Sequence, residues 1–142
     1  MMIVERLRAE HLLFIELQPA QAFAQALLTR EYAETIAGQT GVGWTVLKDG
    51  KPVACGGVAE QWPGRAEAWT LLSDDALRTF RHVHRVAQGV IAEAPWNRIE
   101  MKVDARHDAG VRWAKRLGFE CEGLMRKYTT DGRDIFLFAR VK

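Results

Sequence analysis

Cysteine is scarce in this sequence, and no apolar run is long. Only two cysteines occur among the 142 residues, Cys55 and Cys121, and they form neither a disulfide framework nor a metal-ligand spacing. No apolar run approaches the roughly 20 residues that cross a membrane, and the charged N-terminus is not a signal peptide. We therefore expect a soluble protein with free thiols in the reducing cytoplasm.

The signatures of several large enzyme classes are also missing. The sequence has no zinc-binding motif, no G-x-S-x-G, no Walker sequence and no pair of catalytic carboxylates. Neither sign of charge dominates, because 20 Lys and Arg stand against 18 Asp and Glu for a net charge of +2. This balance does not favour nucleic acid as a partner. Association with nucleic acid is kept only as a third hypothesis, on Arg78, Arg81, Arg85 and Arg98.

The composition is that of a folded domain. Hydrophobic residues make up 48% of the chain and charged residues 27%, and the length suits a single domain over residues 1–142. A chain of this length can bury a core without disulfides or a metal. Five tryptophans are many for this length, and we expect several of them to line a core or a pocket.

Hydrophobic periodicity predicts the element order β-α-β-β-β-α-β-α-β-β. Strands are expected at residues 2–7, 44–48, 51–60, 66–72, 98–103, 119–127 and 134–141. Helices are expected at residues 19–38, 74–94 and 107–118. A hairpin meander precedes a β-α-β unit in this order and the chain ends in two antiparallel strands, which indicates a mixed sheet with helices on both faces.

Local residues refine this outline. Asp49-Gly50 predicts a hairpin turn, and Gly56-Gly57 indicates a bulge or a close backbone approach. Ser73 is a predicted N-cap, with Asp74 and Asp75 in the first helical turn. Gly118 is expected to end the last helix in the left-handed conformation.

The C-terminal third carries a set of spaced residues that suggest a family. They are His107-x-x-Gly110, Leu117-Gly118-Phe119, Glu122-Gly123, Arg126 and Asp134. Together with the strand order, they resemble the GCN5-related N-acetyltransferase (GNAT) superfamily, especially the branch that acetylates ribosomal-protein N-termini. Compact phage and prophage members are similar in the Leu-Leu-Ser and Arg-Trp-Ala segments. The resemblance covers nearly the whole chain. It implies an α/β (α+β) acyl-CoA N-acyltransferase fold, with a mixed six- to seven-stranded sheet and splayed central strands.

The resemblance also implies acetyl-CoA as cosubstrate. The strands on either side of the last helix would splay apart to admit it, with Gly123 marking an irregularity. Backbone N–H groups of the strand before the long helix would bind the thioester carbonyl and the pantetheine amides. The cofactor-binding residues implied in this way are Trp69, Leu71, Leu72, Ser73, Arg78, Arg81, His82, His107 and Trp113. His107 stands where the family has an asparagine; it could instead cap its helix, and Trp113 could simply pack in the core.

Two departures from the family pattern concern the cofactor. The family holds the pyrophosphate in a glycine-rich turn at a helix N-terminus, but residues 71–78 contain no glycine. Asp74 and Asp75 would repel phosphates there, while the basic residues that follow could offset the repulsion or form a solvated face. A tyrosine that protonates the CoA thiolate in many members is replaced by Ala114.

Candidates for the chemistry itself are few. Glu67, on the strand before the long helix, is the best general-base candidate, directly or through a water, and Glu60 is second. Either could equally be a solvated surface carboxylate, and the strand pattern leaves the facing of Glu67 open. Ser73 could donate to the cofactor or the thiolate, or act only as an N-cap. Cys55 with a histidine elsewhere is a further alternative.

Two main hypotheses follow. The first is an acetyl-CoA-dependent N-acetyltransferase that acts on a protein N-terminus, a lysine or a small molecule. The alternative is a non-catalytic phage or prophage accessory or virion protein with this fold that has lost normal CoA binding. It would use a partner surface around Trp62 and Trp96. The acceptor is not readable from the sequence, and a homodimer stays open.

Overall fold

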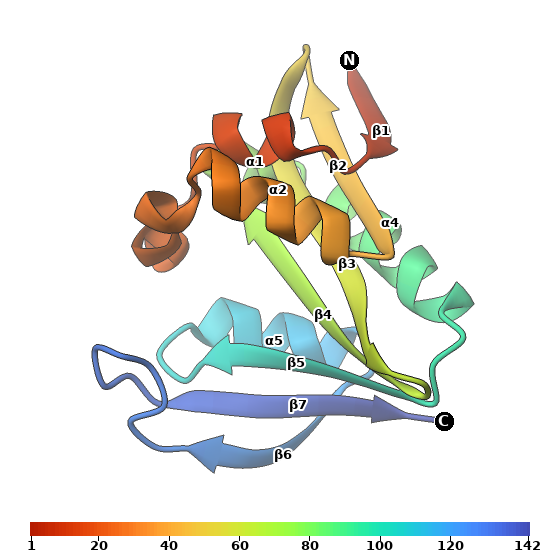
Figure 1. Ribbon diagram of the computed structural model, residues 1–142, viewed down its shortest axis with the longest axis vertical. Coiled ribbons are helices and arrows are strands. Elements are labelled where there is room, and N and C mark those ends of the chain that lie inside the picture. The colour runs from red at the N-terminus through yellow and green to blue at the C-terminus, as the bar shows by residue number, and fades with distance from the viewer. The chain divides into compact units, whose positions relative to one another are not determined.

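The computed structural model describes residues 1–142. Its seven strands are β1 (Met2–Arg6), β2 (Val42–Lys48), β3 (Lys51–Trp62), β4 (Arg65–Leu72), β5 (Arg98–Asp104), β6 (Glu120–Met125) and β7 (Ile135–Val141). Its six helical segments are α1 (Ala9–Phe14), the 3-10 helix η1 (Pro19–Leu27), α2 (Arg30–Gln39), α3 (Asp74–Arg78), α4 (Phe80–Glu93) and α5 (Asp108–Arg116). Hydrogen bonds link the strands in the order β1-β2-β3-β4-β5-β7-β6, a mixed sheet as predicted (Figure 1). None of the helical segments combines the length and hydropathy that a membrane crossing requires.

Two compact units divide the chain. The N-terminal unit comprises residues 1–59 and 69–94, and the C-terminal unit comprises residues 60–68 and 95–142. Strands β3 and β4 therefore contribute residues to both units. Each unit buries apolar side chains of its own, such as Leu12 and Val83 in the first and Ile99 and Phe138 in the second.

The N-terminal unit is built on an antiparallel meander of β1, β2 and β3. Met2 pairs with Lys48 at one end of the β1–β2 ladder, and Lys48 pairs with Lys51 across the β2–β3 hairpin. The hairpin turns through Asp49 at φ 52° and Gly50 at φ 80°. Asp-Gly is the dipeptide that tolerates two left-handed residues in succession, so the predicted turn is confirmed.

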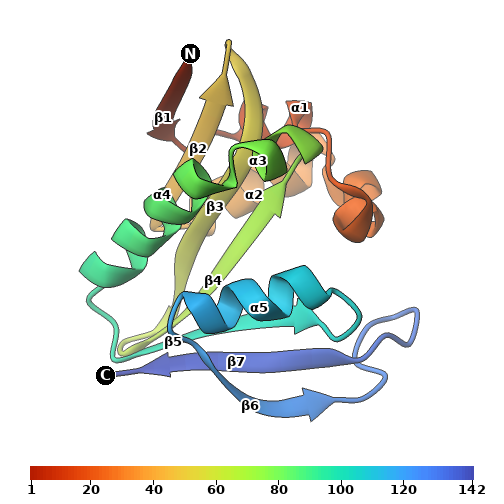
Figure 2. The ribbon, with the colours of Figure 1, turned by 180° about the vertical axis from the view of Figure 1, so that it is seen from behind.

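Helices cover both faces of this meander, as predicted. Helices α1 and α2 lie on one face, whereas α3 and α4 lie on the opposite face (Figures 1 and 2). One apolar cluster of this unit contains Leu7, Leu12, Ile15, Leu28, Ala33 and Cys55. Helix α4 buries Val83, Ala87 and Ile91, whose spacing of four residues places them on one stripe of the helix.

The prediction of a single helix at residues 19–38 is wrong, because two helical segments occupy that range. Segment η1 ends at Leu27, and α2 begins only at Arg30. Between them, Thr29 caps α2 with its Oγ1, which accepts a hydrogen bond of 3.3 Å from the Tyr32 N–H. A capping threonine adopts extended backbone angles, and these interrupt the helix that precedes it.

The prediction of one continuous helix after Ser73 is also wrong. The Ser73 cap itself is confirmed, since its Oγ accepts a 3.3 Å hydrogen bond from the Ala76 N–H. Helix α3 then ends at Thr79, which has φ −120° and ψ 34°. The Thr79 hydroxyl donates to the Asp75 carbonyl at 3.3 Å, so this side chain bonds to backbone within the turn and the helix restarts as α4.

Gly56 and Gly57 permit two close approaches inside the N-terminal unit. A Cβ added at Gly56 would lie 2.4 Å from Cζ2 of Trp44, and one added at Gly57 would lie 2.3 Å from Cγ2 of Thr40. Of the two alternatives that the sequence left open, the close approach is therefore confirmed here. The register shift of this β2–β3 ladder lies elsewhere, after Val46.

The C-terminal unit is an antiparallel β5-β7-β6 arrangement with α5 on one face (Figure 2). Gly118, at φ 93°, ends α5 as predicted. The N–H of Phe119 donates to Ala114 at 3.1 Å, and the N–H of Gly118 donates to Lys115 at 3.0 Å. These two bonds form a Schellman motif, and Phe119, at 2% exposure, anchors the turn in the core.

The expectation that the two strands on either side of α5, β5 and β6, splay apart to leave a gap is wrong. Strand β7 lies between β5 and β6 and is hydrogen-bonded to both. The irregularity expected at Gly123 is confirmed, since the β6–β7 register shifts between Cys121 and Gly123. The ladder that ends early is instead the parallel one between β4 and β5, whose last pair is Glu67 with Glu100.

Candidate functional site

Glu67 lies on the polar face of β4 in the C-terminal unit. Its neighbour Ala66 is fully buried on the other face, whereas the Glu67 side chain is 29% exposed. Its Oε1 forms a 2.9 Å ion pair with Lys102 Nζ, and Lys102 also lies 5.8 Å from the centre of the Tyr128 ring. The Glu67 side chain therefore points to the polar face of β4, a point that the sequence left open. A held but partly accessible carboxylate can accept a proton directly or through a water.

Glu100 is the centre of an ion-pair network on the same face. Arg65 contacts it through two nitrogens at 2.6 and 3.0 Å, and Arg98 Nε contacts it at 2.6 Å. The hydrogen bonds from Arg65 are the main reason that the pKa of Glu100 falls to about 2. Arg98 is also paired with Glu122 at 2.5 Å. Arg98 is therefore neutralised, which removes it from the set of basic residues considered for nucleic acid.

The other candidate base and nucleophile are less suited to catalysis. Glu60 accepts a 3.0 Å hydrogen bond from the indole N–H of Trp96. Cys55 is fully buried, and burial raises the pKa of its thiol to about 12. A thiol that no substrate can reach and that is slow to ionise is a poor nucleophile, which argues against the alternative of a cysteine nucleophile. No cluster of three or more His, Cys, Asp or Glu side chains could hold a metal ion.

The C-terminal half of β4 belongs to the N-terminal unit and contains three of the predicted cofactor residues. Trp69 and Leu71 are partly buried against the apolar cluster of Leu12 and its neighbours. The Trp69 indole N–H donates to Thr40 Oγ1 at 3.2 Å, and Leu72 is buried. These side chains pack the strand end into the N-terminal unit.

The backbone edge at this strand end is already hydrogen-bonded. The N–H of Ser73 donates to Val53 of β3 at 2.8 Å, so the groups of Leu72 and Thr70 lie on the opposite edge. There, Gln21 Oε1 accepts from the Leu72 N–H and Gln21 Nε2 donates to the Thr70 carbonyl, both at 2.8 Å. The Leu72 carbonyl accepts from the Gln18 N–H at 2.8 Å. The N–H expected to meet the cofactor thus has an internal partner.

Ser73 and the residues after it form a tight but anionic turn. Ser73 is 6% exposed, and its Oγ caps α3. Asp74 and Asp75 fill the first turn of α3, where they match the positive end of the helix dipole. Asp75 also lies 3.8 Å from Arg78. The backbone of this five-residue helix is therefore poorly suited to hold a phosphate.

Basic side chains gather at the start of α4. Arg78 and Arg81 are exposed, and Arg85 follows one turn later. The Nε2 atom of His82 is buried and has no hydrogen-bond partner. A buried polar atom without a partner is rare in folded proteins and marks a place where a ligand or water belongs.

The predicted residues of α5 lie in the C-terminal unit. His107 is the N-cap position, but its side chain makes no capping hydrogen bond, so it is not a helix cap in the ordinary sense. A Cβ added at Gly110 would lie 2.7 Å from His107 Nδ1, which shows how closely the imidazole packs on the helix. Trp113 is partly buried, and Ala114 is 1% exposed. No proton donor therefore replaces the tyrosine of the family pattern at position 114.

Comparison with known proteins identifies the fold. No protein-family model and no curated protein sequence matches the chain. Solved structures match over nearly its whole length. The ribosomal-protein-alanine N-acetyltransferase of Brucella melitensis has a TM-score of 0.78 and 14% identity, with 99% of each chain covered. Ard1 from Thermoplasma volcanium has a TM-score of 0.80 and 12% identity, with 99% of this chain and 97% of the other covered. The chain has the GNAT acetyltransferase fold.

A third GNAT structure of the same fold is the alpha-N-protein acetyltransferase RimL in complex with coenzyme A. It has a TM-score of 0.73 and 14% identity, with 99% of this chain and 93% of RimL covered. The sequence did not reveal that Gln18 and Gln21 of this chain hydrogen-bond to the end of β4. Only the closely spaced glutamines Gln18, Gln21 and Gln25 around η1 could have suggested it, and such a pattern has no general meaning.

Proposed function

We propose that this protein is an acetyl-CoA-dependent N-acetyltransferase that moves an acetyl group to an amine. The observation that carries the proposal is the fold itself, which matches solved acetyltransferases over 99% of the chain. A fold does not fix a function, so the proposal also depends on side chains that suit the cosubstrate and the reaction.

The phosphates of acetyl-CoA fit the start of α4 better than the turn before it. Asp74 and Asp75 oppose an anion at the N-terminus of α3. Arg78 and Arg81 offer exposed cationic groups within about one helical turn, and His82 follows with a buried Nε2 that has no hydrogen-bond partner. We therefore assign phosphate binding to the two arginines in place of a glycine-rich turn, with His82 joining them if its Nε2 becomes accessible.

Glu67 is assigned the role of general base. Acetyl-CoA supplies a thioester, whose acyl carbon forms a new C–N bond with the amine as the C–S bond breaks and the sulfur leaves as a thiolate. The attacking amine must first be neutral, and Glu67 accepts its proton directly or through a water. Lys102 holds the carboxylate at 2.9 Å and fixes its orientation. Ala114 donates no proton, so we assign protonation of the thiolate to water or to the released amine proton.

The first acceptor to test is a protein α-amino group. RimL and the Brucella protein are acetyltransferases of a protein α-amino group and of a ribosomal-protein alanine. Lysine side chains and small amines are the other acceptors that the proposal covers. A panel of short peptides with different first residues, each with a free or a blocked N-terminus, separates these classes.

The test is calorimetric titration with acetyl-CoA. The wild-type protein should bind, and the double variant Arg78→Glu, Arg81→Glu should bind at least tenfold more weakly because two phosphate contacts become repulsive. Arg30→Glu is the matched control, since Arg30 is an exposed arginine on α2 with only a 3.9 Å pair to Glu34. Absence of binding at millimolar acetyl-CoA, in the wild type and in variants that free the edge of β4 alike, would reject the proposal. The chain would then be a non-catalytic protein that kept the fold, the reading that Asp74 and Asp75 favour.

A further inference from the structure

The end of β4 is completed by a side chain instead of a strand. One carboxamide, that of Gln21, accepts from Leu72 and donates to Thr70. A residue of a parallel strand opposite Leu71 would make the same two hydrogen bonds through its own C=O and N–H. The Leu72 carbonyl, on the same edge, accepts a hydrogen bond from the Gln18 N–H. The outer edge from Thr70 to Leu72 is therefore satisfied by the chain itself.

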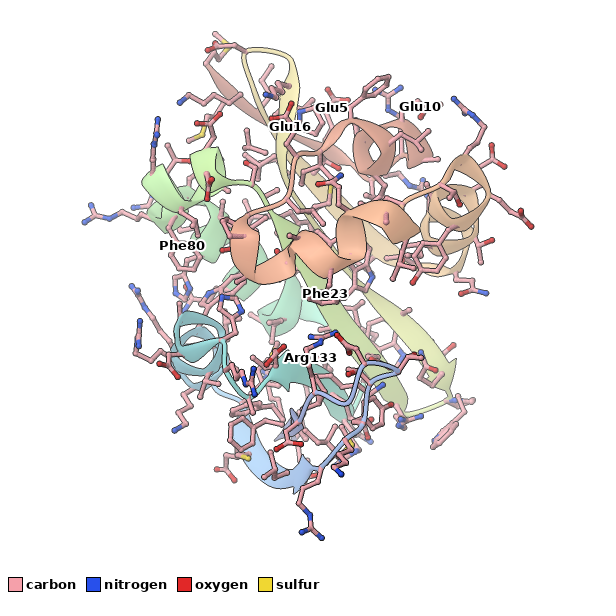
Figure 3. All side chains as sticks on the ribbon, turned by 90° about the vertical axis from the view of Figure 1, so that its left-hand side faces the viewer. Glu5, Glu10, Glu16, Phe23, Phe80 and Arg133 are labelled. Carbon is pink, nitrogen blue, oxygen red and sulfur yellow. The ribbon has the colours of Figure 1, made fainter.

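The segment that supplies this carboxamide is weakly anchored in the core. None of the nine residues of η1 is buried, and Phe23 extends from it at 52% exposure (Figure 3). A 3-10 helix of nine residues is unusually long, and its hydrogen-bond geometry is poorer than that of an α-helix. Glutamine amides hold its two ends: Gln21 bonds to β4, and Gln25 bonds to Ile15 and Leu17 at 2.9 and 2.8 Å.

We propose that η1 is an autoinhibitory strap whose Gln21 carboxamide competes with the pantetheine amides of acyl-CoA for the edge of β4. This inference rests on the proposed function. Pantetheine is an extended chain with two amides, and such a chain binds by adding to a free strand edge. Its amides would replace the two hydrogen bonds of the Gln21 carboxamide, so the Leu72 N–H and the Thr70 carbonyl would each keep a partner. The polar groups of Gln18 and Gln21 would then hydrogen-bond to water, and η1 would move away from the end of β4.

The binding test compares Gln21→Ala with the matched control Gln88→Ala, which removes an exposed glutamine from α4. Loss of two internal hydrogen bonds should tighten acetyl-CoA binding about tenfold in Gln21→Ala, because the competitor is gone. Gln88→Ala should bind as the wild type does. Gln21→Met is a second variant that keeps the length and packing of the side chain without its amide, and it should also bind more tightly.

A second measurement starts with the protein alone, before acetyl-CoA is added. Amide hydrogen exchange followed by NMR should show the Leu72 N–H protected in the wild type and in Gln88→Ala, and exchanging at least tenfold faster in Gln21→Ala. On saturation with acetyl-CoA, Leu72 should stay protected in the wild type while the amides of η1 lose protection.

The two proposals fail in different ways. If the wild type, Gln21→Ala and Gln21→Met bind acetyl-CoA with equal affinity, the proposal that η1 is autoinhibitory is overturned and the acetyltransferase proposal stays intact. No binding by any of these proteins would overturn the proposed function and the strap with it. Binding by the Gln21 variants alone would support both, and would mean that the strap is closed in the isolated protein.

Discussion

Lys102 Nζ lies 2.9 Å from Glu67 Oε1, a contact that joins β5 to β4 within the C-terminal unit. It places one carboxylate on the polar face of β4, in the last pair of the β4–β5 ladder. Replacing Glu67 by glutamine keeps the shape and removes the proton acceptor. We expect kcat to fall about 100-fold or more, the usual contribution of a general base, with KM for acetyl-CoA unchanged.

Release of the CoA thiol, followed with the best acceptor of the peptide panel, measures this effect. Glu60→Gln is the control, because Glu60 is a strand carboxylate that accepts a hydrogen bond from the Trp96 indole. Its kcat should match that of the wild type. Equal loss of activity in both variants, or none in Glu67→Gln, would remove Glu67 from the mechanism.

The Glu100 network should matter for stability. Glu100→Gln leaves Arg65 without its carboxylate partner, and we expect it to lower the free energy of unfolding at pH 7 by about 2 kcal/mol. Glu122→Gln removes an exposed partner of Arg98, and it should have little effect. Urea unfolding monitored by tryptophan fluorescence compares the three proteins; a larger loss in Glu122→Gln would contradict the assignment.

The same network predicts a dependence on pH in the acid range. The pKa of Glu100 is about 2 in the folded protein and near 4.5 when unperturbed. Because the folded pKa is the lower one, the stabilisation is present above about pH 4.5 and is lost as the pH falls toward 2. The difference in unfolding midpoint between the wild type and Glu100→Gln should therefore shrink from pH 5 to pH 2.5. A constant difference would show that the ion pairs are not its cause.

The close approach of Gly56 to Trp44 predicts opposite effects for two glycine substitutions. Gly56→Ala places a Cβ 2.4 Å from the Trp44 ring, and it should destabilise the protein by about 2 kcal/mol. Gly38 lies within α2 with nothing within 4 Å of its added Cβ, so Gly38→Ala should stabilise by about 0.5 kcal/mol. Thermal unfolding of both variants checks the signs, and the same sign in both would refute the packing argument.

His11 predicts a second pH effect, near neutrality. Burial is the main cause that lowers the pKa of His11, Arg8 lowers it further, and Glu5 and Glu10 act in the opposite sense. A lowered folded pKa means that its stabilisation is complete above about pH 6.5 and is lost as the pH falls below that value.

The matched variant is His11→Gln, since a glutamine can still accept the 3.1 Å hydrogen bond that the Arg8 N–H donates to His11 Nδ1. The urea midpoint of the wild type should fall more between pH 7 and pH 5 than that of His11→Gln. Parallel pH profiles would show that His11 does not titrate on unfolding.

The sequence by itself determined the features whose cause is local. Asp49-Gly50 defines a hairpin because few other dipeptides tolerate two left-handed residues, and Ser73 and Gly118 cap helices through atoms within a few residues. The helix breaks at Thr29 and Thr79 were missed, because hydrophobic periodicity continues across a capping threonine. The order of the seven strands along the chain followed correctly from such local signals, and the acetyltransferase fold followed from the family resemblance of the C-terminal third.

Only the tertiary structure decided which groups meet. Strand β7 lies between β5 and β6. The ion pair of Glu67 with Lys102 and the hydrogen bonds of Gln21 to the end of β4 join residues 35 to 51 positions apart. Strand pairing and side-chain hydrogen bonds of this kind depend on three-dimensional register, which no sequence spacing encodes. The sequence therefore predicted a GNAT fold, but the folded chain alone shows that the edge of β4 is closed by its own glutamine.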